Sequence, residues 1–433
     1  MELRHPARFW FFGVLFIMLV AFLIGPPIPD DKQVANCVYN VRLKGPFGIS
    51  LVCDSPEFMR LATHPTALLE PENSRQSRPG LVLAAALLTP PLSPLRGLTR
   101  YFGVRVELGS MNPGKVSNAV ASYPPAFVAY LLLDIVFLAA AFGCLMKICK
   151  PAATPLETTI VVAAGLLLLA NHTVKFIWSP HTQIFNLLVP MLGVVAALQA
   201  WSDRLRDRRY ALAMGAIIGV GFTAYPLFAV LAPCIALPAL VRMRRLPWQE
   251  VRVRLANLAI VLTLSVLPYA AWFVFVRLKT GGFYSAEVAE YGLVVWMRDA
   301  WGHGAGTLAT ALVQKLGRLL GFAATQAIGV ALIFAWVLAV PMFGGVRVQL
   351  RPVLQVIGAA LLVSALAAAF YTSVGLIESR LAYATVPPLI AIAAAAGVTS
   401  ARQISPRYGC LLAAGCLAIA VAQTLVTVIN SNA

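Results

Sequence analysis

Residues 80–98 read GLVLAAALLTPPLSPLRGL, and the role given to this segment decides the topology of the rest of the chain. It is almost as long as the roughly 20 apolar residues that a transmembrane helix needs. Counted as a span, it would place every later basic loop outside the membrane, although Lys and Arg favour the cytoplasmic side. Pro90, Pro91 and Pro94 also interrupt a helix here. We therefore predict a juxtamembrane or re-entrant element, not a full span.

Composition indicates the class of protein. Of the 433 residues, 60% are hydrophobic and only 12% are charged, far from the balance of a soluble globular domain. Lipid cannot satisfy free backbone N–H and C=O groups, so the crossing segments must be helical. We predict an all-α fold, a polytopic transmembrane helical bundle that forms one membrane-embedded domain over residues 1–433.

We expect about eleven spans, from the apolar runs long enough to cross the hydrocarbon core. They lie near residues 9–25, 124–146, 156–170, 183–201, 210–225, 226–241, 256–276, 322–343, 352–371, 382–400 and 409–428. Arg4 and Arg8 precede the first, which we interpret as an uncleaved helix with a cytoplasmic N-terminus.

The net charge of +17 does not indicate nucleic-acid binding, because the basic residues form short runs between apolar segments. With the segment 80–98 outside, these runs all fall on one side of the membrane. Arg greatly outnumbers Lys, and Ala is abundant, as in a GC-rich bacterial genome. We expect the bacterial inner membrane, with membrane lipids as partners and no nucleic acid.

Two long segments are then extracytoplasmic. The first loop covers residues 27–123. The second, residues 277–321, interleaves aromatic and basic side chains with leucines, which predicts a helix lying in the membrane interface.

The first outer loop contains the stretch Cys53-Asp54-Ser55-Pro56-Glu57-Phe58-Met59-Arg60-Leu61-Ala62, with Arg75 and Arg78 close behind it. In so apolar a chain, acids beside bases at the membrane surface are the first place to look for chemistry. An equal alternative, which does not exclude a functional role, is that Asp54 caps a helix that begins near Pro56. If that segment is helical, Asp54 and Glu57 could instead share a divalent cation.

This arrangement resembles the GT-C superfamily of membrane glycosyltransferases, which take a sugar from a polyprenyl-phosphate carrier on the outer face. The resemblance lies in the acidic stretch that begins at Asp54, in the Pro-containing segment opened by Arg78-Pro79-Gly80-Leu81, and in the late segment 378–388, ESRLAYATVPP. It implies a polyprenyl-phosphate sugar donor and a lipid or glycan acceptor. The adjacent Asp-Glu pair of several family branches is missing here, so their metal dependence does not carry over.

Within this resemblance, sugar transfer needs a base for the acceptor hydroxyl and cations for the phosphate left behind. Asp54 is the expected base, with Glu57 as a second catalytic carboxylate. Candidate phosphate ligands are the basic residues at outer ends of spans, each of which could instead be a snorkelling interfacial residue. They are Arg78, His172, Lys175, His181 and Arg380, the last beside Glu378.

Other features leave alternatives open. Cys37 and Cys53 share the first outer loop and could form a disulfide there or remain free thiols. His172 and His181 lack the spacing and the neighbours of a zinc site. Asp134, within a span, could serve a proton path or hydrogen-bond a neighbouring helix, the latter being favoured.

Two other function classes remain. A polymerase or ligase of lipid-linked glycans would place its basic residues in a later outer loop, such as residues 277–321. A secondary transporter would show inverted repeats and several polar residues within spans, which are not evident here.

Overall fold

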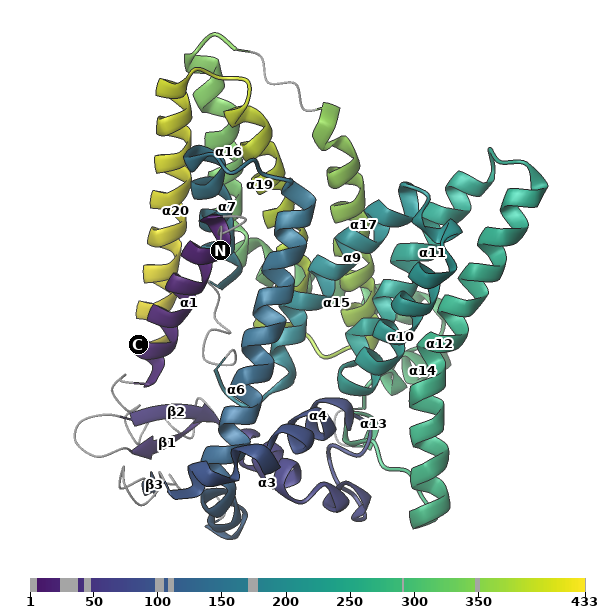
Figure 1. Ribbon diagram of the computed structural model, residues 1–433. Helices are drawn as coiled ribbons and strands as arrows, with labels where there is room; N and C mark the ends of the chain where they lie inside the picture. The colour runs from purple at the N-terminus through teal and green to yellow at the C-terminus, as the bar shows by residue number, and fades with distance from the viewer. Residues whose placement is uncertain are drawn as a thin grey trace.

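The computed structural model describes residues 6–23, 38–42, 48–97, 105–107, 113–169, 178–289, 292–346 and 351–432. Helices dominate these ranges and run between two ends of an elongated bundle (Figure 1). The strands, α3 and α4 gather at the lower end in this view. The turns that join α11 to α12 and α19 to α20 lie at the other end.

Six helical segments are long and apolar enough to cross a membrane. Two bent pairs could each add one more: α15 (Ala305–Gln326) with α16 (Ile328–Phe343), bent by 59°, and α18 (Ser379–Ala382) and η7 (Tyr383–Thr385) with α19 (Pro387–Ala401), bent by 40°. The six segments are built on α6 (Pro113–Cys149), α9 (Phe185–Trp201), α11 (Leu231–Met243), α12 (Trp248–Thr280), α17 (Leu354–Val374) and α20 (Pro406–Asn432). Short 3₁₀ turns precede α9, α11 and α17, namely η3 (Thr182–Ile184), η5 (Pro226–Val230) and η6 (Arg351–Val353).

The predicted number of about eleven spans is therefore not confirmed. The remaining three predicted spans are helical, but they are not among the segments that qualify as spans: α1 (Pro6–Leu23), α7 (Pro155–Leu169) and α10 (Arg208–Ala224). The described residues end at Leu23 after α1 and at Leu169 after α7, whereas α10 lies between Asp207 and the extended residue Tyr225. The described helices support six to eight crossings.

The segment 80–98 forms α4 (Gly80–Leu88) followed by the 3₁₀ helix η2 (Pro90–Arg96). At about 1.5 Å per residue, nine residues span roughly 14 Å, about half of a hydrocarbon core. The prediction that this segment is not a full span agrees with this length. Gly80 lets α4 pack closely against the end of α10. A Cβ at this position would lie only 2.4 Å from Thr223 Oγ1 and 2.8 Å from Ala224 N.

The described strands form one small antiparallel sheet, which lies between α1 and α6 along this predominantly helical chain. Its order is β2-β1-β3, with β1 (Val38–Arg42) between β2 (Gly48–Val52) and β3 (Arg105–Glu107). Strands of three to five residues give too short an alternation to stand out in so apolar a chain. The register pairs Val38 with Val52, so the sheet ends directly before Cys53 and Asp54.

Three glycines, Gly215, Gly219 and Gly221, let α10 lie close against α12 and η5. A Cβ on Gly219 would lie 2.1 Å from Leu264 O, a backbone atom of α12. Close backbone approach of this kind is typical of packing between membrane helices.

Asp134 lies in the middle of α6 and is 2% exposed. Its expected hydrogen bond to a neighbouring helix is not formed by Oδ2, which is buried and has no hydrogen-bond partner among the described residues.

The second outer segment is helical over α13 (Ala286–Ala289), α14 (Val295–Gly302) and the start of α15. Trp296 Nε1 donates to Ser373 O at 3.1 Å, which fixes α14 to the end of α17. Lys315 lies over the Trp296 ring, 4.6 Å from its centroid, and donates to Gly375 O at 2.8 Å.

Candidate functional site

Asp54 lies at the junction between β2 and α3 (Ser55–Thr63). It occupies the N-cap position of α3, but its side chain makes no capping hydrogen bond. Instead, Oδ2 lies 2.7 Å from Arg75 Nη2 and 3.4 Å from His181 Nε2. The capping interpretation is therefore wrong, and the carboxylate is directed at two groups that are distant in sequence.

The local structure holds α3 beside the His181 loop. Ser55 Oγ donates to Pro180 O at 3.3 Å, and Tyr130 Oη of α6 donates to Phe58 O at 3.0 Å. The buried side chain of Phe58 also lies between two site groups. Its ring centroid is 4.5 Å from Arg75 Cζ and 6.0 Å from the His181 ring centroid.

His181 is a neutral hydrogen-bond donor to Asp54. Its Nδ1 accepts a hydrogen bond from Gln183 N at 3.1 Å, so a neutral ring carries its proton on Nε2. Burial lowers the pKa of His181 to about 4, despite the opposing effect of Asp54. Near neutral pH, the ring therefore donates to Asp54 without adding a charge.

Asp54 is held ionised and remains accessible. Burial opposes its ionisation, but the His181 hydrogen bond and the Arg75 charge outweigh it and hold the pKa of this carboxyl well below its usual range. The side chain is still 43% exposed. The shortest contacts to Arg75 and His181 both go to Oδ2. The exposed part of the carboxylate can therefore receive a proton from an incoming group.

Arg75 is the cationic partner of Asp54 and is only 9% exposed. Its backbone N–H donates to Asn73 Oδ1 at 2.9 Å, which fixes the turn that presents it. Its Nε is buried and has no hydrogen-bond partner in the described part of the chain. Arg75 therefore retains a donor beyond its ion pair with Asp54.

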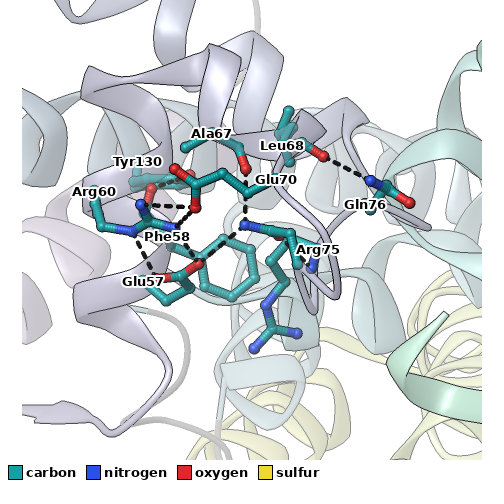
Figure 2. A network of polar contacts seen from close by, with 10 residues as sticks. Glu57, Phe58, Arg60, Ala67, Leu68, Glu70, Arg75, Gln76 and Tyr130 are labelled. Atoms are coloured by element: carbon teal, nitrogen blue, oxygen red, sulfur yellow. Dashed lines mark hydrogen bonds and ion pairs between the residues drawn. The ribbon is translucent and has the colours of Figure 1, made fainter. Parts of the chain in front are cut away.

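Glu57 belongs to a different hydrogen-bond network from that of Asp54. Its carboxylate accepts hydrogen bonds from Arg60 Nε and Nη2, each at 3.0 Å (Figure 2). It also accepts one from Asn73 Nδ2 at 3.4 Å. Arg60 also reaches Glu70 at 3.3 Å, across η1 (Pro65–Leu69). These bonds join α3 to the following turn.

The predicted cation site between Asp54 and Glu57 is therefore not formed. Each carboxylate has its own cationic partner, Arg75 for Asp54 and Arg60 for Glu57. Over the described ranges, no three His, Cys, Asp or Glu side chains are grouped as they would be to hold a metal ion.

Arg78 is paired with Glu287 of α13, a residue that was not predicted to lie at the site. Glu287 Oε2 also accepts from Ser77 Oγ at 2.7 Å and from Ser285 Oγ at 2.8 Å. Burial raises the pKa of Glu287, but the Arg78 charge and the serine hydroxyls outweigh this and lower it. Burial lowers the pKa of Arg78, against the effect of Glu287. An ionised Glu287 thus covers a largely buried guanidinium.

Gln76 anchors this second outer segment over the first. Its Oε1 accepts from Tyr284 N at 2.6 Å, and its backbone carbonyl accepts from Trp272 Nε1 of α12 at 2.8 Å. These bonds place Glu287 against Arg78.

A buried polar chain leads from this region toward Arg380. Tyr225 Oη and Tyr371 Oη are 3.0 Å apart, and Tyr371 donates to Asn186 Oδ1 at 2.5 Å. Asn186 Nδ2 in turn donates to Arg380 O at 3.1 Å. The charges of Arg78 and Arg380 both act on the Tyr225 hydroxyl, whose pKa is raised mainly by burial.

The structure thus brings together four of the predicted site residues. Arg380 forms an ion pair with Glu378, and its charge also acts on His181. The group consists of Asp54, Arg78, His181 and Arg380. His172 and Lys175 lie outside the described residues.

Cys53, next to Asp54, is disulfide-bonded. Its predicted partner, Cys37, lies outside the described residues. The cysteines found free are Cys144, Cys149, Cys234, Cys410 and Cys416. A covalent link at Cys53 restrains the chain directly before the candidate base.

Comparison with protein-family models, with curated proteins and with solved structures finds no match for this chain. The chemistry of the site therefore rests on its geometry. An ionised, accessible carboxylate can accept a proton from a hydroxyl group. The neighbouring guanidinium groups can bind an anion such as a phosphate.

Proposed function

We propose that this chain is a membrane glycosyltransferase that moves a sugar from a polyprenyl-phosphate donor to a lipid or glycan acceptor. The observation that carries the proposal is the accessible, ionised carboxylate of Asp54 close to Arg75, Arg78 and Arg380. It combines, at one end of an apolar bundle, a proton acceptor with cations for a lipid-linked phosphate.

In the proposed reaction, the acceptor hydroxyl lies at the exposed part of the Asp54 carboxylate. Its oxygen forms a bond to the anomeric carbon while the bond from that carbon to the phosphate oxygen breaks. The hydroxyl proton passes to Asp54, and the bonding electrons leave with the polyprenyl phosphate. Because Asp54 is a weak base, proton transfer is expected late, when bond formation has made the hydroxyl acidic. Attack opposite the leaving group inverts the anomeric configuration.

Arg78 and Arg380 are the proposed partners of the donor phosphate. Guanidinium groups bind phosphate oxygens in bidentate fashion and stabilise the charge that grows on the leaving group. In the ligand-free protein, carboxylates neutralise both, Glu287 for Arg78 and Glu378 for Arg380. A bound phosphate would compete with Glu287 and Glu378 for these two arginines.

The proposed location is the outer face of the bacterial inner membrane. Basic turns such as residues 204–209 and 242–245 lie at the end of the bundle away from α3 and α4 (Figure 1). Cytoplasmic loops carry the excess of Lys and Arg, which favours an extracytoplasmic Asp54.

The polymerase or ligase alternative receives less support. It would use basic residues of the second outer segment at the site. However, Lys315 lies over Trp296, and Arg318 lies 5.8 Å from the Phe322 ring centroid. Glu287 is the charged group of that segment that reaches Arg78.

The proposal is tested by mass spectrometry of glycolipids and surface glycans from a strain that lacks this protein. A glycosylated species should disappear in the deletion strain and return with the wild-type chain or with Asp299→Asn, an exposed outer carboxylate. Asp54→Asn, present in the membrane at the same level, should not restore it. Full restoration by Asp54→Asn, or unchanged glycans in the deletion strain, would contradict the proposal.

A further inference from the structure

A second charged region lies at the opposite end of the bundle, in a cavity of about 540 Å³. The ends of α6, α9 and α19 and the start of α17 surround it. Its inner wall is apolar and includes Val195, Leu198, Val356 and Ala395. Its basic lining residues are Lys147, Lys150, Arg204 and Arg402.

The charge of this cavity is largely uncompensated. Lys147, Lys150 and Arg204 are exposed and form no ion pair within the described part of the chain. Arg402 pairs with Glu157 at 2.9 Å and donates to Lys150 O at 2.8 Å. Three helices end here, and each C-terminus carries roughly half a negative charge. These termini offset only about half of the three remaining positive charges.

A second hollow of about 400 Å³ continues from the same two lysines. It is lined by Arg8, Gly143, Met146, Lys147, Lys150 and Pro151, and thus lies between α1 and α6. A Cβ on Gly143 would meet no atom within 4 Å, so the hollow extends along α6 one turn beyond Lys147. Lys147 and Lys150 therefore line both hollows. They lie between the cavity with the basic lining residues and the groove beside Gly143 on the outside of the bundle.

Lys150 also has an unusual backbone conformation. Its φ is 44°, in the left-handed region where glycine is the usual residue at a helix end. Its N–H donates to Met146 O at 2.9 Å, and Pro151 follows. The backbone does not need a lysine here, so glycine can replace it without strain.

From this geometry we infer that the paired hollows bind an anionic phospholipid. Its headgroup phosphate lies between Lys147 and Lys150, and an acyl chain follows the groove beside Gly143. Basic residues at the cytoplasmic ends of membrane helices attract anionic lipids, and a pocket between helices makes that attraction specific. This site is separate from Asp54 and does not depend on the proposed reaction.

The test uses the full chain, purified in zwitterionic detergent, and measures its thermal unfolding midpoint with added lipid. Phosphatidylglycerol should raise the midpoint by about 3 °C more than phosphatidylcholine does. Lys147→Ala with Lys150→Gly should remove most of this difference. The matched control, Arg244→Ala with Arg245→Ala, removes two exposed cations at the same end and should keep it. Native mass spectrometry should show phosphatidylglycerol retained by the wild type and the control but lost from the lysine variant.

Two further measurements separate a lipid from a soluble anion. Gly143→Leu fills the groove while keeping the lysines, and it should reduce the phosphatidylglycerol effect. Inorganic phosphate should not reproduce the stabilisation. Equal effects of the two lipids, an unchanged effect in the lysine variant, an unchanged effect in Gly143→Leu, or equal stabilisation by inorganic phosphate would each overturn the inference.

Discussion

The two ends of the bundle use similar charged residues in different ways. At the Asp54 end, arginines are buried and matched to carboxylates, and the Arg78 side chain is 17% exposed beside Glu287. At the other end, Lys147, Lys150 and Arg204 are exposed without a described ion-pair partner, and even the paired Arg402 is 46% exposed. Exposed cations suffice to set orientation and attract lipid. Buried, matched charges are costly unless they fix a geometry, and the other end has one such cation, Arg254, which is 3% exposed and pairs with Asp203 and Glu250. Arginines contact both carboxylate oxygens of Asp203, whereas the shortest contacts of Asp54 to Arg75 and His181 both go to Oδ2, and this difference marks the Asp54 end as the candidate reaction site.

The largest expected effect on the Asp54 end is loss of phosphate binding. Arg78→Ala should weaken binding of undecaprenyl phosphate about 100-fold, because it removes a buried guanidinium donor. Scintillation proximity with radiolabelled undecaprenyl phosphate measures this directly. Arg244→Ala, at the other end, should leave the affinity unchanged. An Arg78→Ala protein that binds as tightly as the wild type would remove Arg78 from the phosphate site.

A second effect is a change in the pH dependence of stability. The pKa of His181 is about 4 in the folded protein and about 6.5 when unfolded, so the unfolded chain takes up the proton first as pH falls. The stability that this shift provides is complete above pH 6.5 and is lost as pH falls toward 4.

Between pH 7 and pH 5, this loss amounts to about 2 kcal/mol. His181→Gln keeps a donor for Asp54 but does not titrate, so its stability should change less over this interval. Urea unfolding in detergent at both pH values provides the comparison. Equal losses in the wild type and His181→Gln would show that His181 is not held neutral.

The smallest effect concerns Glu57. Glu57→Gln should lower the free energy of unfolding by about 1 kcal/mol, because it weakens the half-buried ion pair with Arg60. Undecaprenyl phosphate binding should be unchanged, since Glu57 faces away from Arg78 and Arg380. A decrease in affinity of more than about tenfold would contradict the structural role assigned to Glu57.

Apolar periodicity predicted the helices well but not the number of crossings. The composition required a helical membrane protein, and all eleven predicted spans correspond to helices. The helix α10 nevertheless has only 17 residues, because it begins after Asp207 and ends before the extended residue Tyr225. The short strands of the first outer loop gave no comparable signal.

The membrane topology was sufficient to predict which end of the bundle holds several site residues. Placing the basic turns on one side put Asp54, Arg78, His181 and Arg380 on the other, and the structure brings these four together. Glu287 was missed because its approach to Arg78 depends on how the second outer segment docks over Gln76.

Local spacing also failed to predict the direction of a side chain. The three-residue spacing of Asp54 and Glu57 suggested a shared role. However, the Glu57 carboxylate forms an ion pair with Arg60, three residues later. The Asp54 carboxylate contacts Arg75 and His181 instead. Tyr371 and Asn186 also lay within apolar runs, where nothing local distinguished them from packing residues.

The central claim is that Asp54 does chemistry and that Glu57, one helical turn away, does not. The most direct test compares the transfer product in deletion-strain membranes that contain equal amounts of Asp54→Asn or Glu57→Gln protein, measured by mass spectrometry. We predict that Asp54→Asn lowers the rate of product formation at least about 100-fold, the scale of a lost general base, while Glu57→Gln stays within about threefold of the wild type. Near-wild-type product from Asp54→Asn, or an equal loss from both variants, would contradict the account.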